Sequence, residues 1–233
     1  MGLLTPARRM GHEVLDEPGV SPDLVMRSHR DITRANALFG GTRAVVARVR
    51  AIEHRLPASP LVVDVGAGSG DILDAVCAVL RDGGRRPRPV AVDTAVALAP
   101  AVRQRGSHFI CGSIFALPLA TAAADLVIAA QVIHHFPHHD VHSVLAELNR
   151  VARHAVLVSD LRRSWIAAAG LWASSFPLGF HPVSRHDGVV SVLRGFAPEE
   201  LRSAIRQATG ATADVHTHLG WRVTADWHPG HAA

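Results

Sequence analysis

Three glycines follow a short apolar run and could hold a ligand against the backbone. The segment LVVDVGAGSGDI, residues 61–72, ends its apolar run at Asp64 and then places Gly66, Gly68 and Gly70 at alternate positions. Glycine loses more backbone freedom on folding than any other residue, so three in five positions need a reason. A glycine turn lets the backbone approach a ligand closely, and the following helix points its free N–H groups at the same place. The segment predicts a ligand-binding turn between a strand and a helix, with a tight turn that binds nothing as the alternative.

The spacing of the glycines separates this turn from the dinucleotide fingerprint G-x-G-x-x-G. The third glycine of that fingerprint would fall at position 71, which is Asp71. A second acid, Asp93, ends the next apolar run, PVAVD, and could accept both hydroxyls of a ribose. Strand, acid, glycines, helix and second acid therefore occur in the order expected for a ligand that contains a ribose.

The elements that must position these residues alternate between short apolar runs and helices. Strands are predicted at 61–65, 89–93, 109–112, 125–130 and 155–160, helices at 42–56, 71–82, 139–153 and 197–208, and a closing pair of strands at 212–219 and 221–227. Apolar strands without alternation, separated by helices, are typical of a parallel sheet covered on both faces, so the predicted fold class is α/β, doubly wound. Residues 1–56 are predicted as an N-terminal helical lid and residues 57–233 as the main domain.

The ordered motifs between residues 60 and 160 resemble the class I S-adenosylmethionine-dependent methyltransferases of the small-molecule type. VVDVGAGSGD, VAVD, CGSIFALPL and ADLVIAAQVIHHF resemble their first four motifs, in the style of the ubiquinone-biosynthesis enzymes and of methyltransferase type 11. The resemblance implies a mostly parallel, seven-stranded Rossmann-like sheet and S-adenosyl-L-methionine as the cofactor. It also implies that Gly66, Ala67 and Gly68 line the methionine part of the cofactor and that Asp93 takes the ribose hydroxyls. Relatives usually carry an acid for the adenine amino group where this chain has Ser113, whose hydroxyl can still accept a hydrogen bond.

The segment SHRDITRANALFGGTR, residues 28–43, resembles the N-terminal lid of a bacterial subgroup found among phenolic-polyketide modifying enzymes. The resemblance makes Asn36 and Arg43 candidates for closing over the cofactor, and Arg43 could pair with its carboxylate. A solvated helix face is the alternative for Arg43. The complete set of expected cofactor residues is Asp64, Gly66, Ala67, Gly68, Asp71, Asp93, Thr94, Ser113, Ile114, Gln131, Arg43 and Asn36.

Methyl transfer to a hydroxyl would need a base near the end of the fourth strand. The cofactor supplies the reactive methyl group, while the protein must hold the nucleophile in line and take its proton. His134 is the preferred base because it follows that strand and because histidine titrates near neutral pH. His135 and His186 are the other candidates, and a packed histidine that orients the loop is the alternative for His134.

Five histidines between residues 134 and 142 also raise the question of a metal. His138 and His142 are four residues apart on a predicted helix, which is half of a zinc spacing. No third ligand with a suitable spacing follows, and the chain holds 16 histidines, so the sequence favours no metal.

The expected acceptor is a small lipophilic molecule with a phenolic or polyketide-type hydroxyl. The turn after the fourth strand lacks the polar-Pro-Pro-aromatic residues that nucleobase methyltransferases need, and the apolar stretch 165–180 could wall a pocket, with a core helix as its alternative. The expected substrate residues are Asp160, Arg162, Trp165, Trp172 and Arg185. Asp160 could instead cap a helix that begins near Leu161. Two other reactions stay open: a non-methylating cyclisation or decarboxylation that uses bound cofactor, and C-methylation of a quinol-like ring. A partner subunit that has lost the cofactor is a third possibility.

Composition sets the remaining expectations. The chain has 233 residues, 48% hydrophobic and 19% charged, with a formal charge of only +4, which is typical of a globular protein and does not demand a nucleic-acid partner. Cys77 and Cys111 lie in apolar runs and are expected to be buried and unpaired. No run is long enough to span a membrane. We expect a cytoplasmic monomer or homodimer with a small-molecule acceptor.

Overall fold

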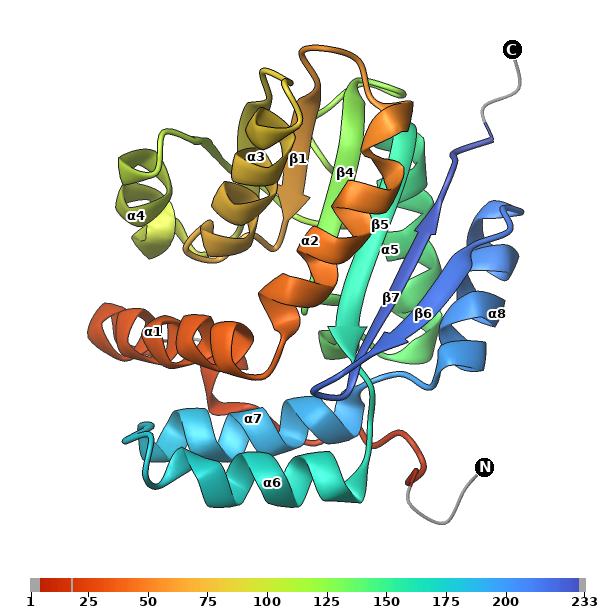
Figure 1. Cartoon of the computed structure of the whole chain (residues 1–233). Coiled ribbons are helices and arrows are strands. Elements are labelled where there is room, and N and C mark those ends of the chain that lie inside the picture. Colours follow the sequence, from red (N-terminus) through yellow and green to blue (C-terminus); the bar gives the residue numbers. More distant parts are fainter. Residues whose placement is uncertain (1–4, 18, 231–233) are drawn as a thin grey trace.

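Seven strands form one sheet in the order β3-β2-β1-β4-β5-β7-β6 in the computed structural model, which describes residues 5–17 and 19–230 (Figure 1). The strands are β1 Leu61–Val65, β2 Arg88–Asp93, β3 His108–Cys111, β4 Ala124–Ala130, β5 Ala152–Leu161, β6 Asp214–His218 and β7 Arg222–Trp227. The first five strands pair in parallel, and β7 runs antiparallel to both β5 and β6. The predicted seven-stranded, mostly parallel sheet is therefore confirmed, together with its closing pair of strands.

Helices cover both faces of the sheet and also the edge at which the parallel strands end. The helices are α1 Pro22–Leu38, α2 Gly41–Ile52, α3 Asp71–Asp82, α4 Ala99–Gln104, α5 His138–Val151, α6 Trp165–Ser175, α7 Pro182–Arg194 and α8 Pro198–Thr209. Figure 1 shows α2 and α3 on one face and α5 and α8 on the other, with α1, α6 and α7 crossing below the arrowheads of β1 and β5. The fold thus encloses the carboxyl edge of the sheet, where parallel α/β folds bind ligands.

Local sequence explains how the chain turns at this edge. All seven residues of β4 are buried, as expected for a central strand between two helical layers. The turn from β1 into α3 ends at Gly70, whose φ of 77° is in the left-handed region that glycine tolerates. Helix α1 begins where the Ser21 hydroxyl accepts a hydrogen bond from Leu24 N and Pro22 occupies the first turn.

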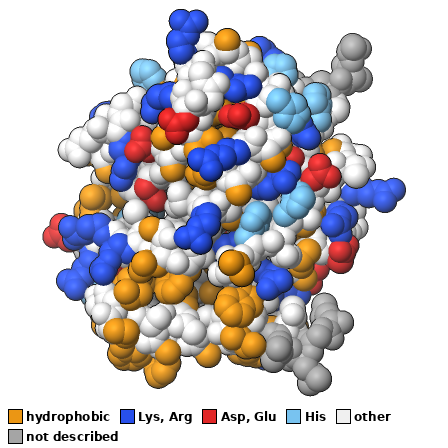
Figure 2. All heavy atoms as spheres, in the orientation of Figure 1, with side chains coloured by type: hydrophobic (Ala, Val, Ile, Leu, Met, Phe, Trp, Pro, Cys, Tyr) orange, Lys and Arg blue, Asp and Glu red, His pale blue; other side chains and the backbone are white. Residues whose placement is uncertain are grey.

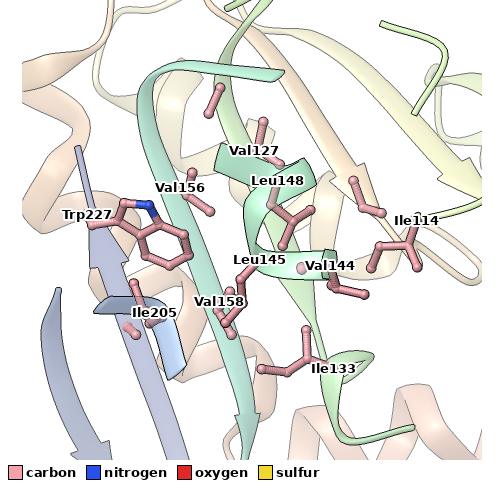
Figure 3. Close-up of a cluster of buried hydrophobic side chains, with 14 of the residues drawn as sticks. Ile114, Val127, Ile133, Val144, Leu145, Leu148, Val156, Val158, Ile205 and Trp227 are labelled. Carbon is pink, nitrogen blue, oxygen red and sulfur yellow. The ribbon is translucent and has the colours of Figure 1, made fainter. Parts of the chain in front are cut away.

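Each face of the sheet has its own hydrophobic core. Side chains of α2 and α3 form one core with β1, β4 and β5, and side chains of α5 and α8 form the other. Figure 3 shows the second core between Trp227 and Ile114, with Ile133 at its lower end. Ile133 is fully buried, so this core anchors the short turn that carries His134.

The structure differs from the sequence-based expectations in α7, Cys111 and Asp160. Residues 182–194, for which no helix was predicted, form α7, which begins with Pro182 behind a His181 cap. Cys111 is exposed and not buried, because β3 is an edge strand. Asp160 caps no helix, since α6 begins only at Trp165 and the Ser164 hydroxyl caps it.

The segment expected as a lid, residues 1–56, has parts in different layers. Helix α1 lies across the carboxyl edge, but α2 buries Val45, Val49 and Ile52 in the same core as α3 and belongs to a face of the sheet. The edge is covered by α1 together with α6 and α7. No helix of the described residues has the length and apolar character needed to cross a membrane.

Candidate active site

A cavity of about 630 Å³ lies at the carboxyl edge of the sheet. The glycine turn and the ends of β2 and β4 contribute to its lining, as do α1, α6, α7 and the tip of the β6–β7 hairpin. The expected site residues that line it are Gly66, Ala67, Gly68, Asp71, Asp93, Thr94, Ile114, Gln131, Asn36, His134 and His135. Residues expected to hold the cofactor and two of the three expected catalytic histidines therefore share one cavity.

The glycine turn has the shape of a cradle. Gly66 and Gly68 have φ values of 71° and 55°, so a side chain at either position would be strained. A Cβ atom on Gly66 would lie 2.6 Å from Val132 Cγ2, and one on Gly68 would lie 3.0 Å from His29 Cε1. Only glycine fits at these positions, and the turn presents bare backbone to the cavity.

Asp93 holds this turn in place from the end of β2. Its Oδ2 atom accepts a hydrogen bond from Gly68 N at 2.8 Å, and its Oδ1 atom accepts one from Ala95 N at 2.8 Å. The carboxylate also lines the cavity, and each oxygen has lone pairs left for a hydroxyl donor. Cradle and carboxylate together fit the ribose and methionine parts of S-adenosylmethionine.

Helix α1 closes over the turn through side chains that the sequence analysis did not single out. Thr33 Oγ1 donates to Asp71 Oδ1 at 3.2 Å, and Ser69 Oγ donates to the same oxygen at 2.9 Å. His29, which also lines the cavity, packs against Gly68. Burial lowers the pKa of His29, although the charges of Asp93 and Asp71 partly oppose it. His29 is therefore a mostly neutral lid residue at neutral pH.

Gln131 links the end of β4 to helix α1. Its φ of 57° is unusual for a residue other than glycine, and its backbone N–H donates to Ser159 O at 2.7 Å. Its amide donates through Nε2 to Asn36 Oδ1 and accepts through Oε1 from Arg222 Nη1 at 3.1 Å. Strained residues held by their surroundings cluster at binding sites, and Gln131 lies in the cavity wall.

His134 and Asp160 form a buried pair at the ends of β4 and β5. His134 Nδ1 lies 2.6 Å from Asp160 Oδ1, and Asp160 Oδ2 accepts from His134 N at 3.0 Å. Burial disfavours the charge of Asp160, but attraction to His134 and hydrogen bonds from His134 and Leu161 N outweigh it, so the pKa of Asp160 is below its ordinary value. The other ring nitrogen, Nε2, is buried and has no hydrogen-bond partner among the described residues. An ionised carboxylate that holds one nitrogen leaves the other able to accept a proton.

A second charged cluster surrounds His135, whose ring stacks on His134 with the centroids 4.3 Å apart. His135 Nδ1 lies 3.2 Å from Asp16 Oδ1 and 3.6 Å from Glu13 Oε2. Burial lowers the pKa of His135, but the Asp16 hydrogen bond and the charges of Glu13 and Asp16 raise it more, so the net shift is upward. Burial likewise opposes the charge of Asp16, yet His135 and Arg194 lower its pKa to about 2.

Glu13, His134 and His135 are also near enough to one another to be considered as metal ligands. Arg194 Nη1, however, lies 2.9 Å from Glu13 Oε1, 3.0 Å from Asp16 Oδ2 and 3.4 Å from His135 Nδ1. The guanidinium already supplies the positive charge at the centre of this cluster. His138 and His142, the pair with half of a zinc spacing, are exposed on α5.

The structure places several expected site residues outside the cavity lining. They are Asp64, Ser113, Arg43, Asp160, Arg162, Trp165, Trp172, Arg185 and His186. Arg43 is exposed on α2, and Asp160 reaches the cavity only through His134. Ser113 is exposed, and its hydroxyl accepts from Phe115 N within a local turn. Asp64 is buried in β1, where burial and the nearby charges of Asp71 and Asp93 raise its pKa well above the ordinary value.

The two tryptophans lie on the side of α6 that faces away from the cavity. Trp165 and Trp172 are 43% and 54% exposed, and Arg185 stacks on Phe176 at 3.7 Å on the same side. Residues that are seven positions apart lie on the same face of a helix, so the side chains of both tryptophans point in the same direction. Figure 2 shows hydrophobic side chains gathered on the lower part of the molecule, where Figure 1 places α6 and α7. The face of α6 toward the cavity carries smaller side chains: Ile166, Ala167, Gly170, Leu171 and Ser174.

Comparison with known proteins identifies the family of the chain. Residues 63–158 match the family described as "Methyltransferase domain". The protein is an S-adenosylmethionine-dependent methyltransferase. S-adenosylmethionine is the cofactor of this family, and the matched segment includes the glycine turn, Asp93 and His134, all of which line the cavity. A search of curated proteins found no match to the chain.

Solved structures share the fold of the methyltransferase. A SAM-dependent methyltransferase from Aquifex aeolicus is 14% identical, with a TM-score of 0.61, and the match covers 90% of this chain and 98% of that one. The 1,6-didemethyltoxoflavin-N1-methyltransferase of Burkholderia thailandensis is 18% identical, with a TM-score of 0.57 and 92% of both chains covered. Human N-acetylserotonin methyltransferase is 15% identical, with a TM-score of 0.62, and 91% of this chain and 57% of that one are covered. At these identities the likeness establishes the fold alone.

Proposed function

We propose that this methyltransferase methylates a hydroxyl oxygen of a small lipophilic acceptor, with a phenol as the best-suited hydroxyl. The observation that carries the proposal is the His134–Asp160 pair at the cavity, with Nε2 of His134 left without a partner among the described residues. The solved structures of similar fold include an N1-methyltransferase by name, so they do not separate oxygen from nitrogen acceptors. A base of this kind is needed for a hydroxyl, which must lose its proton as it reacts.

The pair has the geometry of an oriented general base. Asp160 accepts from Nδ1, which fixes the imidazole tautomer with Nε2 as the acceptor atom. As the hydroxyl oxygen bonds to the methyl carbon, its proton moves to Nε2, and the charge that forms on the ring is stabilised by the ionised carboxylate of Asp160. When bound, S-adenosylmethionine would supply the electrophilic methyl group, whose bond to the sulfonium sulfur breaks with its electron pair left on sulfur, so that neutral S-adenosylhomocysteine is the leaving group. A phenol ionises near pH 10, so a neutral imidazole can take its proton once the oxygen begins to react.

The cavity walls favour an apolar acceptor. Helix α7 adds the polar Ser184, Asp187 and Ser191 to the lining, and the hydrophobic lining residues near α1, α6 and α7 are Ile32, Phe39, Phe136, Leu161, Ile166, Leu171, Phe180 and Val192. Apolar walls with a few convergent polar groups are typical of small-molecule sites. Nε2 of His134 is buried in this structure, so a side chain of the site must move before a hydroxyl can reach it.

Variants of the pair test the proposal. His134→Gln and Asp160→Asn should lower kcat by at least about a hundredfold, because each removes the base or its orientation. The affinity for S-adenosylhomocysteine, measured by calorimetric titration, should stay within about twofold of the parent. His138→Gln, on the exposed face of α5, is the matched control and should change neither quantity.

Two outcomes would count against the assigned base. An equal loss of turnover and cofactor affinity in His134→Gln would mean that the residue only packs the loop. Full turnover in both variants, with the fold shown intact by thermal unfolding, would mean that another group takes the proton.

A further inference from the structure

Arg222 is a buried cation that pairs with no carboxylate of the described residues. Three arginines are buried among the described residues: Arg163, Arg194 and Arg222. Arg163 pairs with Glu200, and Arg194 pairs with carboxylates of the N-terminal segment. Arg222 is only 4% exposed, yet no described carboxylate lies within ion-pair distance of it.

The hydrogen bonds of Arg222 go to neutral oxygens. Nε donates to Phe39 O at 3.4 Å, and Nη1 donates to Gln131 Oε1 at 3.1 Å. Nη2 donates to none of the described residues, and the side chain lines the cavity. Burial lowers the pKa of Arg222 to about 10, with Asp160 opposing the shift, so the group remains charged at neutral pH. A buried charge is costly unless it is paired, which points to a partner that arrives with a ligand.

Asp160 does not supply the missing partner. It is already hydrogen-bonded to His134 and Leu161 N. In the β5–β7 register, Asp160 lies opposite Val223, whereas Leu161 lies opposite Arg222. Neighbouring residues of a strand point to opposite faces of the sheet, so the two charges leave the sheet on different sides.

The surroundings of Arg222 place it on the cofactor side of the cavity. Gln131, its partner, directly follows β4, and β4 pairs with β1, which leads into Gly66. Asn36 from the lid holds the other end of the Gln131 amide. Figure 1 shows the β6–β7 hairpin reaching the edge that α1 and α7 cover, which brings Arg222 there from a distant part of the sequence.

We propose that Arg222 is the residue that holds a carboxylate inside the cavity. Two carboxylates could meet it: the one on the methionine part of the cofactor, or one carried by the acceptor. The neighbourhood of Gln131, Asn36 and the glycine turn favours the cofactor. A guanidinium suits this task because its planar donors match a carboxylate in pairs. The proposal does not depend on hydroxyl methylation, because cofactor binding can be measured without an acceptor.

Binding by Arg222→Met, measured by calorimetric titration, tests the proposal. S-adenosylhomocysteine should bind the variant at least tenfold more weakly than the parent, while 5′-methylthioadenosine, which lacks the carboxylate, should bind both equally. Arg50→Met is the matched control, because Arg50 is exposed on α2 and its replacement should leave both affinities unchanged. Arg222→Lys should recover part of the lost affinity. Without ligand, Arg222→Met should unfold at the same temperature as the parent or higher, since the variant no longer buries an unpaired charge.

The second arm uses benzoate and benzamide as probes of the acceptor region. If S-adenosylhomocysteine affinity is unchanged, preferential binding of benzoate to the parent that is lost in Arg222→Met assigns the carboxylate to the acceptor. If Arg222→Met changes neither S-adenosylhomocysteine nor benzoate binding, the proposal is wrong. It is also wrong if S-adenosylhomocysteine and methylthioadenosine lose affinity equally.

Discussion

At the scale of single residues, Asp93 joins the end of β2 to the glycine turn and faces the cavity. It supports the glycine turn through Gly68 N and also presents its oxygens to the cavity. Its position next to the turn explains why one carboxylate can be both a brace and a binding group.

Replacing Asp93 by alanine should weaken cofactor binding at least tenfold. The variant loses an acceptor of two ribose hydrogen bonds, each worth about 1.5–3 kcal/mol because the acceptor is charged. Calorimetric titration with S-adenosylhomocysteine gives the affinity, and thermal unfolding controls for damage to the turn. An unchanged titration curve in a folded variant would contradict the role given to Asp93.

His135 and Asp16 should make stability depend on pH. The raised pKa of His135 means that its contribution is complete below about pH 6.5 and is lost as the pH rises through the raised value. The lowered pKa of Asp16, about 2, means that its contribution is present above about pH 4 and is lost only in strong acid. Urea unfolding of the parent and His135→Gln should therefore differ more at pH 6 than at pH 9. A difference that is equal at both values, or larger at pH 9, would show that His135 packs without carrying a charge.

At the scale of elements, α6 and α7 shape the acceptor end of the cavity. Gly170 lines it, and a Cβ atom there would meet no other atom within 4 Å. A larger side chain at this position would therefore fill the space that an acceptor needs.

Gly170→Phe should reduce turnover on bulky acceptors by more than tenfold and leave the affinity for S-adenosylhomocysteine unchanged. The variant should not unfold more easily, because glycine in a helix interior is already about 1 kcal/mol less favourable than alanine. Trp172→Ala is the control, since its side chain points away from the cavity. If Trp172→Ala changes acceptor preference and Gly170→Phe does not, the acceptor binds on the other side of α6.

An element can be predicted from the sequence when the residues that encode it are adjacent in the chain. The turn at Gly66 and Gly68 and the buried run of β4 are encoded by adjacent residues, so both were predicted correctly. Helix α7 was missed because the face it turns to the cavity is polar and includes Gly188, which hides the usual apolar period.

Helix α6 shows a second limit of prediction from the sequence. The sequence has large aromatic and small residues on opposite faces of this helix, and size alone suggested that Trp165 and Trp172 wall a pocket. The position of Arg222 in the cavity could not be predicted from neighbouring residues, because its partners Phe39 and Gln131 are distant in sequence. Such contacts form only when the assembled sheet brings these distant segments together.

At the scale of the whole molecule, the sheet brings separate segments to one edge. The glycine turn and Asp93 come from one half of the sheet, and Asp160 and Arg222 come from the other. The lid and the α6–α7 pair then enclose the space between them. Cofactor and acceptor can therefore share one cavity, with His134 on its wall.

Methyl transfer from labelled S-adenosylmethionine to a panel of acceptors is the most direct test of this account. The panel holds alkylated phenols, quinols, fatty acids, amines and RNA, and mass spectrometry identifies the methylated atom. The account predicts labelled phenolic ethers, with one S-adenosylhomocysteine formed per ether, and almost no product from His134→Gln. Turnover on amines or RNA with none on any hydroxyl would contradict it.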